Sequence, residues 1–240
     1  MKYDIGRFQY GLADLGVELT EFQTDQFLHY YELLIEKNKV MNLTAITEFQ
    51  EVIEKHFIDS LTLVKAIPDL KDQKVLDLGT GAGFPGIPLK IAFPDLDMVL
   101  LDSLNKRVLF LNDVIRGLGL KGITAIHGRA EETARKKEFR QQFDLCVSRA
   151  VSNLASLSEY CIPFVRIGGY FVSYKSADAD EEIFQAKKAV FLMGGKIEKV
   201  IKFQLPESDQ GRSLVCIRKE KGTPGTYPRK AGTPAKKPIL

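Results

Sequence analysis

Residues 75–86, Val-Leu-Asp-Leu-Gly-Thr-Gly-Ala-Gly-Phe-Pro-Gly, combine a short apolar run, a carboxylate and a turn rich in glycine. Gly79, Gly81 and Gly83 can adopt positive φ angles and leave the backbone open to close approach by a ligand. Pro85 suits the first turn of a helix, where a missing N–H costs nothing. A strand, a glycine turn and a helix in this order are typical of a nucleotide-cofactor site.

Two cofactors compete for this turn. The spacing Gly81-x-Gly83-x-x-Gly86 matches the dinucleotide fingerprint, in which a pyrophosphate lies on the helix N-terminus. Asp77, just before the first glycine, would repel a pyrophosphate but suits the cationic aminoacyl end of S-adenosylmethionine. Asp102 ends the next apolar run and could accept hydrogen bonds from the ribose of either cofactor. The residues therefore favour S-adenosylmethionine, with a dinucleotide, or a turn without a ligand, as the alternatives.

The chain from residue 74 onward predicts the elements that would position this turn. Short apolar runs alternate with segments of helical length, which is typical of a doubly wound parallel sheet, and two closing β-type runs without a helix between them predict an antiparallel hairpin. The expected strands are 74–78, 97–101, 123–127, 143–148, 169–174, 196–205 and 212–218, and the expected helices 85–93, 105–118, 153–166 and 178–193. The predicted fold class is α/β and Rossmann-like, with a mostly parallel seven-stranded sheet, as in class I S-adenosylmethionine-dependent methyltransferases.

The first 70 residues form an N-terminal helical extension in this prediction. Apolar residues recur at helical spacing in 7–15 and 21–36, and Thr20 has the side chain of an N-cap. A further helix is expected from Thr47 to Ala66. The chain thus divides into a helical segment packed on the core (1–70), a cofactor-binding domain (71–220) and a C-terminal tail (221–240).

Composition indicates a globular chain without a membrane span. Of 240 residues, 45% are hydrophobic and 27% charged, and no apolar run approaches the roughly 20 residues that cross a bilayer. Three cysteines among apolar neighbours do not suggest a disulfide framework, so we expect a cytoplasmic protein. The net charge is only +3, but the tail contains five Lys or Arg residues and no acidic residue, interleaved with Pro and Gly. Such a tail could present cations to a polyanion, or could simply be solvated.

Five further segments make the prediction more specific. They are Lys-His-Phe-Ile-Asp-Ser at 55–60, Leu-Asp-Ser-Leu-Asn-Lys-Arg at 101–107, His-Gly-Arg-Ala-Glu-Glu at 127–132, Val-Ser-Arg-Ala-Val at 147–151 and Tyr-Pro-Arg-Lys-Ala-Gly-Thr-Pro at 227–234. Together with the glycine turn, they closely resemble the bacterial RsmG (GidB) family over essentially the whole chain. The resemblance implies S-adenosylmethionine as the cofactor, 16S ribosomal RNA or the small ribosomal subunit as the partner, and methylation of N7 of one guanine in that RNA.

The resemblance also implies particular contacts. It places Gly79 and Phe84 against the cofactor, Ala130 and Glu131 near its adenine, and Arg149 at the same pocket. With the residues of the glycine turn and the next strand end, the expected cofactor-binding set is Asp77, Gly79, Thr80, Gly81, Gly83, Phe84, Asp102, Ser103, Ala130, Glu131 and Arg149. Glu131 could instead be a helix-capping acid.

Cations at the expected strand ends are the candidate catalytic residues: Arg149, Lys106, Lys175 and Arg129, with Arg107 beside them. They could form a basic rim for the RNA backbone. Arg149 adjoins the apolar run 143–147, where an unpaired cation is costly unless it serves a ligand or partner. An ordinary solvated helix start is the alternative for Lys106 and Arg107.

The chemistry requires little from the protein. Guanine N7 already carries a lone pair, so positioning can supply most of the catalysis and no base is needed. Ser-Arg-Ala-Val at 148–151 stands where enzymes that methylate exocyclic amino groups have Asn-Pro-Pro-aromatic, and Cys146 reads as a buried strand residue. The three histidines share no metal-ligand spacing, so no metal is expected. Asp59, three residues after His56, could form a helical hydrogen-bonded pair with it.

Three other functions remain open at this point. A methyltransferase of the same fold could act on a small molecule or a protein, although the basic rim and tail would then be unexplained. A dinucleotide-dependent oxidoreductase would place a pyrophosphate beside Asp77, and an RNA-binding module without activity would not need the glycine turn. For the favoured function, deletion of 221–240 is expected to weaken RNA binding and to leave cofactor affinity unchanged.

Overall fold

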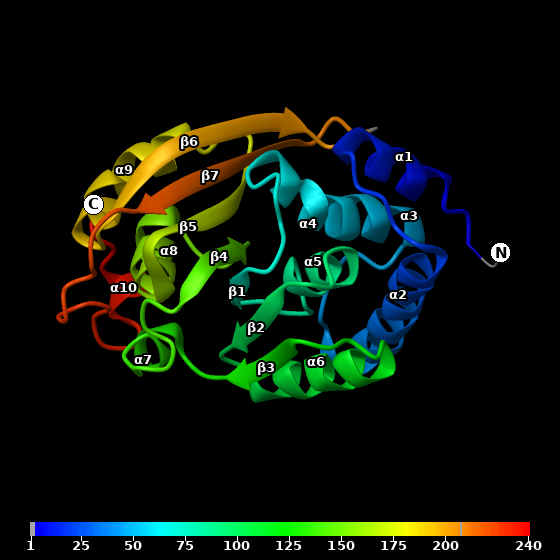
Figure 1. Cartoon of the computed structure of the whole chain (residues 1–240), viewed down its shortest axis with the longest axis horizontal. Helices are drawn as coiled ribbons and strands as arrows, with labels where there is room; N and C mark the ends of the chain where they lie inside the picture. Colours follow the sequence, from blue (N-terminus) through cyan, green and yellow to red (C-terminus); the bar gives the residue numbers. More distant parts are fainter. Residues whose placement is uncertain (1–2, 207) are drawn as a thin grey trace.

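The computed structural model describes residues 3–206 and 208–240 of the chain. Seven strands form one sheet in the order β3-β2-β1-β4-β5-β7-β6 (Figure 1). The strands are β1 (Lys74–Leu78), β2 (Asp97–Asp102), β3 (Ile123–His127), β4 (Phe143–Arg149), β5 (Val165–Ser176), β6 (Gly195–Gln204) and β7 (Gly211–Lys219). Strands β1 to β5 pair in parallel, and β7 is antiparallel to both β5 and β6. The mostly parallel sheet with an antiparallel edge hairpin is thereby confirmed.

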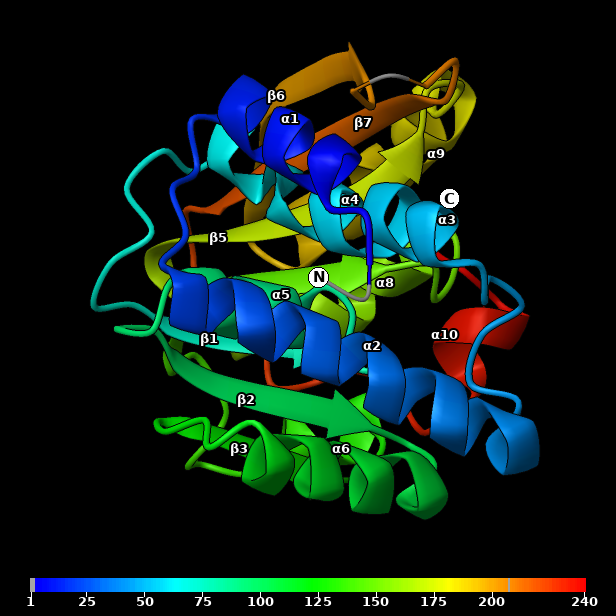
Figure 2. The same cartoon turned by 90° about the vertical axis from the view of Figure 1, so that its right-hand side faces the viewer.

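Helices cover both faces of this sheet. Figure 2 shows α2, α4 and α5 in front of the strands and α8 and α9 behind them. The helices are α1 (Gly6–Leu15), α2 (Glu21–Met41), α3 (Phe49–Val52), α4 (Asp59–Leu61), α5 (Gly86–Ala92), α6 (Asn105–Gly117), α7 (Ala130–Thr133), α8 (Leu154–Cys161), α9 (Asp180–Leu192) and α10 (Thr233–Lys236), with a π-helical segment η1 (Ile53–Ile58) and 3₁₀ turns η2 (Thr62–Lys65) and η3 (Ile162–Phe164). Within the described residues, no helix is long and apolar enough to cross a membrane.

Strand side chains alternate between two hydrophobic cores, because successive residues of a strand point to opposite faces. In β1, Val75 belongs to the core under the N-terminal helices, and Leu76 belongs to the core under α8 and α9. The first core contains a cluster of aromatic side chains from the N-terminal helices. The ring of Phe27 lies 5.0 Å from those of both Phe8 and Phe57. The N-terminal helices therefore share a core with the sheet.

Helix α2 also fixes the glycine turn that follows β1. Its N-terminus is closed by a capping box between Thr20 and Gln23, which confirms the expected N-cap. The Gln23 amide donates to the carbonyl of Ile91 at 2.8 Å, at the end of α5. The buried hydroxyl of Tyr30 donates to the carbonyl of Ala82 at 2.6 Å. Helix α2 thus holds both the turn and the helix that follows it.

The expected helix at 153–166 is shorter in the structure. Helix α8 ends at Cys161, a 3₁₀ turn containing Pro163 follows, and β5 already begins at Val165. Proline lacks the N–H that a continuing helix needs, which accounts for the early end. The short helix α10 was not expected from the sequence, and α7 begins where Glu131 was considered as a helix acid.

Residues 222–237 contact the core, which differs from a fully solvated tail, although the four lysines of 221–240 are exposed. In Figure 1 α10 lies beside α8, near α7. Arg140 donates to the carbonyls of Tyr227 at 3.0 Å and Thr223 at 2.9 Å. The side chain of Arg229 binds the buried carboxylate of Glu159, with Nη2 2.6 Å from Oε2. We call residues 222–237 the C-terminal strap.

Candidate active site

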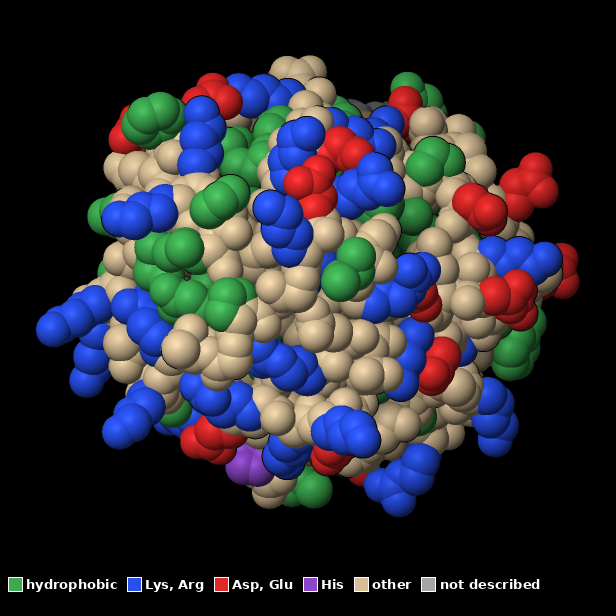
Figure 3. Space-filling model, turned by 60° about the vertical axis from the view of Figure 1, so that its left-hand side comes forward, with side chains coloured by type: hydrophobic (Ala, Val, Ile, Leu, Met, Phe, Trp, Pro, Cys, Tyr) green, Lys and Arg blue, Asp and Glu red, His purple; other side chains and the backbone are tan. Residues whose placement is uncertain are grey.

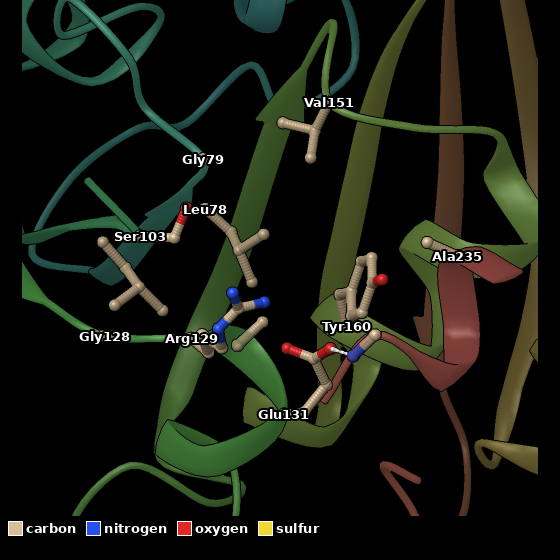
Figure 4. Close-up of a pocket in the computed structure, with 12 residues that line it drawn as sticks. Leu78, Gly79, Ser103, Gly128, Arg129, Glu131, Val151, Tyr160 and Ala235 are labelled. Atoms are coloured by element: carbon tan, nitrogen blue, oxygen red, sulfur yellow. Dashed lines mark hydrogen bonds between the residues drawn. The ribbon is translucent and has the colours of Figure 1, made fainter. Parts of the chain in front are cut away.

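Two cavities lie at the carboxyl ends of β1 and β4, where the strand order reverses, the usual place for a ligand in a doubly wound sheet. The first, called here the glycine-turn cavity, has a volume of about 220 Å³. It is lined by Leu78, Gly79, Leu101, Ser103, Gly128, Arg129, Ala130, Glu131, Val151, Tyr160, Gly232 and Ala235 (Figure 4). The second, called the arginine cavity, has a volume of about 480 Å³. It is lined by Lys55, His56, Asp59, Arg149, Ala150, Tyr174, Lys175, Ser176, Glu182 and Arg212.

The glycine turn leaves no room for a side chain at its first position. Gly79 has a φ of +72°, and a Cβ there would lie 2.4 Å from Cγ2 of Val151. Gly79 N–H donates to the carbonyl of Leu101 at 2.8 Å, which holds the turn against β2. Gly83 is equally restricted, because a Cβ would lie 2.5 Å from Ile87. The backbone of the turn therefore borders the cavity directly.

Asp77 lies beneath the turn and is fully buried. Its Oδ2 accepts from the N–H of Gly86 at 2.8 Å, which fixes the start of α5. Burial raises the pKa of Asp77 to about 6, although the Thr80 hydroxyl and the Gly86 N–H lower it in part. Asp77 and Thr80 thus support the turn from below and are not among the residues that line the cavity.

Asp102 ties the end of β2 to the glycine turn. Its Oδ2 accepts from the N–H of Gly81 at 2.9 Å, and its Oδ1 accepts from the N–H of Leu104 at 2.8 Å. Arg107 approaches Oδ2 at 3.4 Å. A carboxylate has about four acceptor sites, so Asp102 keeps capacity for hydroxyl groups of a ligand.

The far wall of the glycine-turn cavity comes from the C-terminal strap. The nearly buried Glu131 accepts from the N–H of Gly232 at 2.7 Å through Oε1, the bond drawn in Figure 4. Ala235 also lines the cavity. Arg229 anchors the strap, because Glu159 accepts from its Nε and Nη2 at 3.0 and 2.6 Å. No local sequence pattern predicts this wall, because its contacts join residues 70 or more positions apart.

Arg149 lies in the arginine cavity and is paired. Its Nη1 donates to Oδ2 of Asp59 at 2.7 Å and to the carbonyl of Lys55 at 3.1 Å. Its guanidinium lies 5.2 Å from the ring of Phe84, which is buried. Arg149 is therefore not the unpaired cation that its place beside an apolar strand suggested. Its role rests on its place at the cavity.

His56 is held neutral beside Arg149. Its ring stacks on Phe84 with centroids 4.4 Å apart, its Nδ1 lies 3.2 Å from Nη2 of Arg149, and its Nε2 lies 2.9 Å from Oγ1 of Thr44. Burial lowers the pKa of His56 to about 3, and the charges of Arg149 and Lys55 add to this effect. His56 and Asp59 therefore each bond Arg149, in place of the pair with each other that their spacing suggested.

The arginine cavity carries an excess of positive charge. Its lining contains Lys55, Arg149, Lys175 and Arg212 against the carboxylates of Asp59 and Glu182, four cations against two anions. Lys175 donates to the carbonyl of Ser152 at 2.8 Å and to Glu182 at 2.6 Å. Arg212 and Asp59 were not among the expected site residues, although Asp59 lies in one of the motifs used above.

The loop after β4 separates the two cavities. Arg149 and Ala150 line the arginine cavity, and Val151 lines the glycine-turn cavity. Ala150 has a φ of +56°, a strained conformation for a residue with a Cβ. The two cavities therefore adjoin at residues 149–151.

The expected site residues divide between these places. Gly79, Ser103, Arg129, Ala130 and Glu131 line the glycine-turn cavity, and Arg149 and Lys175 line the arginine cavity; Asp77, Thr80, Gly81, Gly83, Phe84 and Asp102 lie beneath or beside them. Lys106 is exposed at the start of α6 and lines neither cavity. Among residues 3–206 and 208–240, no three His, Cys, Asp or Glu side chains are placed to hold a metal ion.

The chain is similar to known proteins over nearly its whole length. The model of the GidB family, described as rRNA small subunit methyltransferase G, matches residues 23–212. A ribosomal RNA small subunit methyltransferase G from Lachnoclostridium phytofermentans is 55% identical over 237 residues, which cover 99% of this chain and 98% of the relative. The chain belongs to the GidB family. The family resemblance seen in the sequence motifs is thereby confirmed.

Two solved structures share the fold of this GidB family member at low identity. A methyltransferase from Bacillus halodurans has a TM-score of 0.52 at 14% identity and covers 68% of this chain and 99% of its own. A precorrin-6y C5,15-methyltransferase from Geobacter metallireducens has a TM-score of 0.50 at 13% identity and covers 75% and 92%. The fold is that of class I S-adenosylmethionine-dependent methyltransferases, as expected.

Proposed function

We propose that this chain transfers a methyl group from S-adenosylmethionine to N7 of one guanine in 16S ribosomal RNA, as the family resemblance implies, in the cytoplasm. One observation carries the proposal: two cavities of different chemistry adjoin across the loop after β4. One is built on a glycine turn and has few charges. The other is rich in arginine and lysine and suits a polyanionic partner.

The glycine-turn cavity suits the nucleoside part of the cofactor. Leu78, Leu101 and Val151 give it apolar walls for a base. Glu131 and Asp102 supply carboxylate oxygens for base amino and ribose hydroxyl groups. S-Adenosylmethionine is favoured over a dinucleotide because the buried Asp77 beneath the turn would repel a pyrophosphate.

The aminoacyl end of the cofactor would extend toward Phe84 and Arg149, where a guanidinium can pair with a carboxylate. S-Adenosylmethionine supplies an activated methyl group on a positively charged sulfur. The Val151 side chain lies against Gly79 at the junction of the two cavities. Positioning of this kind can contribute about 7 to 11 kcal/mol in favourable cases.

The arginine cavity suits the acceptor nucleotide. Guanine presents O6 and N7 as acceptors on one edge, and arginine or lysine commonly binds O6. N7 needs no base, which agrees with a neutral His56 whose pKa is about 3 and with the burial that raises the pKa of Cys146 well above its usual value. The residues of the cavity then orient the base and bind the backbone.

The test is transfer of a labelled methyl group from S-adenosylmethionine to 16S RNA and to 30S particles from a strain that lacks the modification, with the modified base mapped. We expect label on guanine N7, and the better of the two substrates identifies the assembly state that is methylated. Cofactor binding without label on either RNA would refute the proposed acceptor and indicate a small molecule or a protein instead.

A further inference from the structure

We propose that Asp59 is a positioning residue that holds Arg149 and Arg212 side by side in the arginine cavity, so that their remaining N–H groups face the acceptor RNA. This inference rests on the function proposed above. It assigns a role in methyl transfer to a residue of the N-terminal helical layer, outside the sheet that carries the cofactor turn.

One carboxylate bridges two guanidinium groups from strands that are not neighbours. Asp59 Oδ2 accepts from Nη1 of Arg149 at 2.7 Å, and its Oδ1 accepts from Nε of Arg212 at 3.2 Å. Arg149 ends β4 and Arg212 lies near the start of β7, with β5 between the two strands. The carboxylate is 5% exposed, against 13% for Arg149 and 22% for Arg212. All three residues line the arginine cavity, and Asp59 is the most buried of them.

Asp59 leaves donors free on both arginines. A guanidinium has five N–H groups. Arg149 uses three, toward Asp59, the Lys55 carbonyl and His56. Arg212 also uses three, toward Asp59, the Gly211 carbonyl and the Gln210 side chain. Two donors on each therefore have no acceptor among the described residues, and they can serve a ligand.

Asp59 also offsets the repulsion between the two cations. Two guanidinium groups that share a cavity repel each other, and the repulsion grows as water is excluded by a bound ligand. A carboxylate between them compensates this repulsion and fixes their separation. Without Asp59, we expect the arginines to move apart toward solvent.

The backbone of Asp59 is itself held in place. The residue follows the π-helical segment η1, a type of irregularity that is frequent at functional sites. Its carbonyl accepts from the hydroxyl of Thr62 at 2.6 Å. The neighbouring Ser60 carbonyl accepts from the buried hydroxyl of Tyr174 at 2.8 Å, and Tyr174 itself lines the arginine cavity. The carboxylate therefore has a fixed position relative to β5 and the cavity.

The first experiment compares Asp59→Asn with the wild type. We expect kcat for methyl transfer to rRNA to fall on the order of 100-fold, as for a small misplacement of groups that orient a substrate. The Kd for S-adenosylhomocysteine should rise much less, because its aminoacyl end meets only one of the two arginines. Asp144→Asn is the matched control, because Asp144 binds Arg166 at the opposite end of the sheet. It should leave kcat unchanged.

A double-mutant cycle separates positioning from a purely structural role. If Asp59 acts through Arg212, Asp59→Asn should reduce kcat much less in an Arg212→Gln background than in the wild type, whereas the losses in melting temperature need not follow this pattern. Asp59→Glu keeps the charge and serves as the second variant if Asp59→Asn does not fold. It should restore folding and recover part of kcat.

If the wild type methylates rRNA, any of three outcomes would overturn the inference. They are an unchanged kcat in Asp59→Asn, fully additive losses of kcat in the double-mutant cycle, and a loss of kcat that only parallels weaker cofactor binding. A wild type that methylates no rRNA would refute the proposed function instead. The arginine positions would then be tested by NMR of the Nε–H groups. Signals of Arg149 and Arg212 should shift and broaden in Asp59→Asn, and unchanged signals would refute the positioning itself.

Discussion

At the scale of single residues, buried carboxylates fix the backbone of the site. Asp77 and Asp102 both lie at the ends of parallel strands, and both bind backbone N–H groups of the glycine turn or of the helix after it. The sequence correctly indicated that these acids flank the turn. It could not distinguish an acid that touches the ligand from one that supports the turn, because that depends on which way each side chain points in the folded sheet.

Gly79→Ala should weaken cofactor binding by at least about tenfold, which corresponds to roughly 1.4 kcal/mol. The added Cβ would meet Val151 at 2.4 Å, so the turn or the loop after β4 must move. Binding of S-adenosylhomocysteine by calorimetry measures the effect. Gly119→Ala is the control, since Gly119 has a similar φ of +64° with nothing near its Cβ position. It should cost about 1–2 kcal/mol of stability and leave cofactor affinity unchanged. Equal affinity in both variants would contradict this role of the turn.

His56 should contribute to acid unfolding. Its pKa is about 3 in the folded chain and near 6.5 when unfolded, so the unfolded state binds more protons between these values and stability falls as pH decreases through that window. His56→Gln should reduce the pH slope of the unfolding free energy by up to about 1.4 kcal/mol per pH unit there. Urea unfolding at several pH values measures this. An identical slope in both proteins would show that His56 titrates normally in the folded chain.

At the scale of elements, the C-terminal strap changes the interpretation of the tail. Its composition predicted a solvated or RNA-binding segment, yet it packs through Arg229 on α8 and through Gly232 on Glu131. Deletion of 221–240 should therefore weaken cofactor binding as well. The sequence alone predicted an unchanged cofactor affinity, because a local pattern of Lys, Pro and Gly does not encode this long-range packing.

Arg229→Ala and Lys230→Ala distinguish the two roles of the strap. Both remove one positive charge, but Arg229 binds the buried Glu159, whereas Lys230 is exposed. Arg229→Ala should destabilise the protein by about 1–3 kcal/mol and raise the Kd for S-adenosylhomocysteine severalfold, because the wall of the cavity loosens. Lys230→Ala should change neither quantity. If both variants bind the cofactor like the wild type, the strap is not part of its site.

Most elements of the sheet were predictable because each is a short apolar run with a clear end. The first expected strand, 74–78, agrees with β1 in both ends, and 123–127 agrees with β3. The start of β5 was missed, although Pro163 was a local signal for it. The bridge from Asp59 to Arg212 spans 153 positions, and no local pattern predicts such a contact.

On the scale of the whole molecule, the net charge is small but the charged side chains are distributed unevenly. The net charge is +3. Figure 3 shows Lys and Arg predominating over the lower and left-hand parts of one face, with acidic side chains more frequent toward the top and right. The carboxyl edge of the sheet adds the cations of the arginine cavity and the exposed Lys106. Binding to RNA should therefore weaken with added salt.

Lys106→Ala should weaken binding to 16S RNA and reduce the slope of log K against log salt concentration by about 1, as for loss of one phosphate contact. Filter binding at several salt concentrations gives the slope. Lys121→Ala is the control. Lys121 is also exposed, but it precedes β3 and so lies at the amino ends of the strands, whereas Lys106 lies at their carboxyl ends. Equal slopes for the two variants would place the RNA elsewhere.

In the proposed function the cofactor binds in the glycine-turn cavity, and the acceptor nucleotide binds in the adjoining arginine cavity. The most direct measurement is a crystal structure with S-adenosylhomocysteine bound. We expect its adenosine in the glycine-turn cavity between Gly79, Ala130 and Gly232, with its sulfur directed past Val151 toward Arg149. An adenosine that lies in the arginine cavity would contradict the assignment of both cavities.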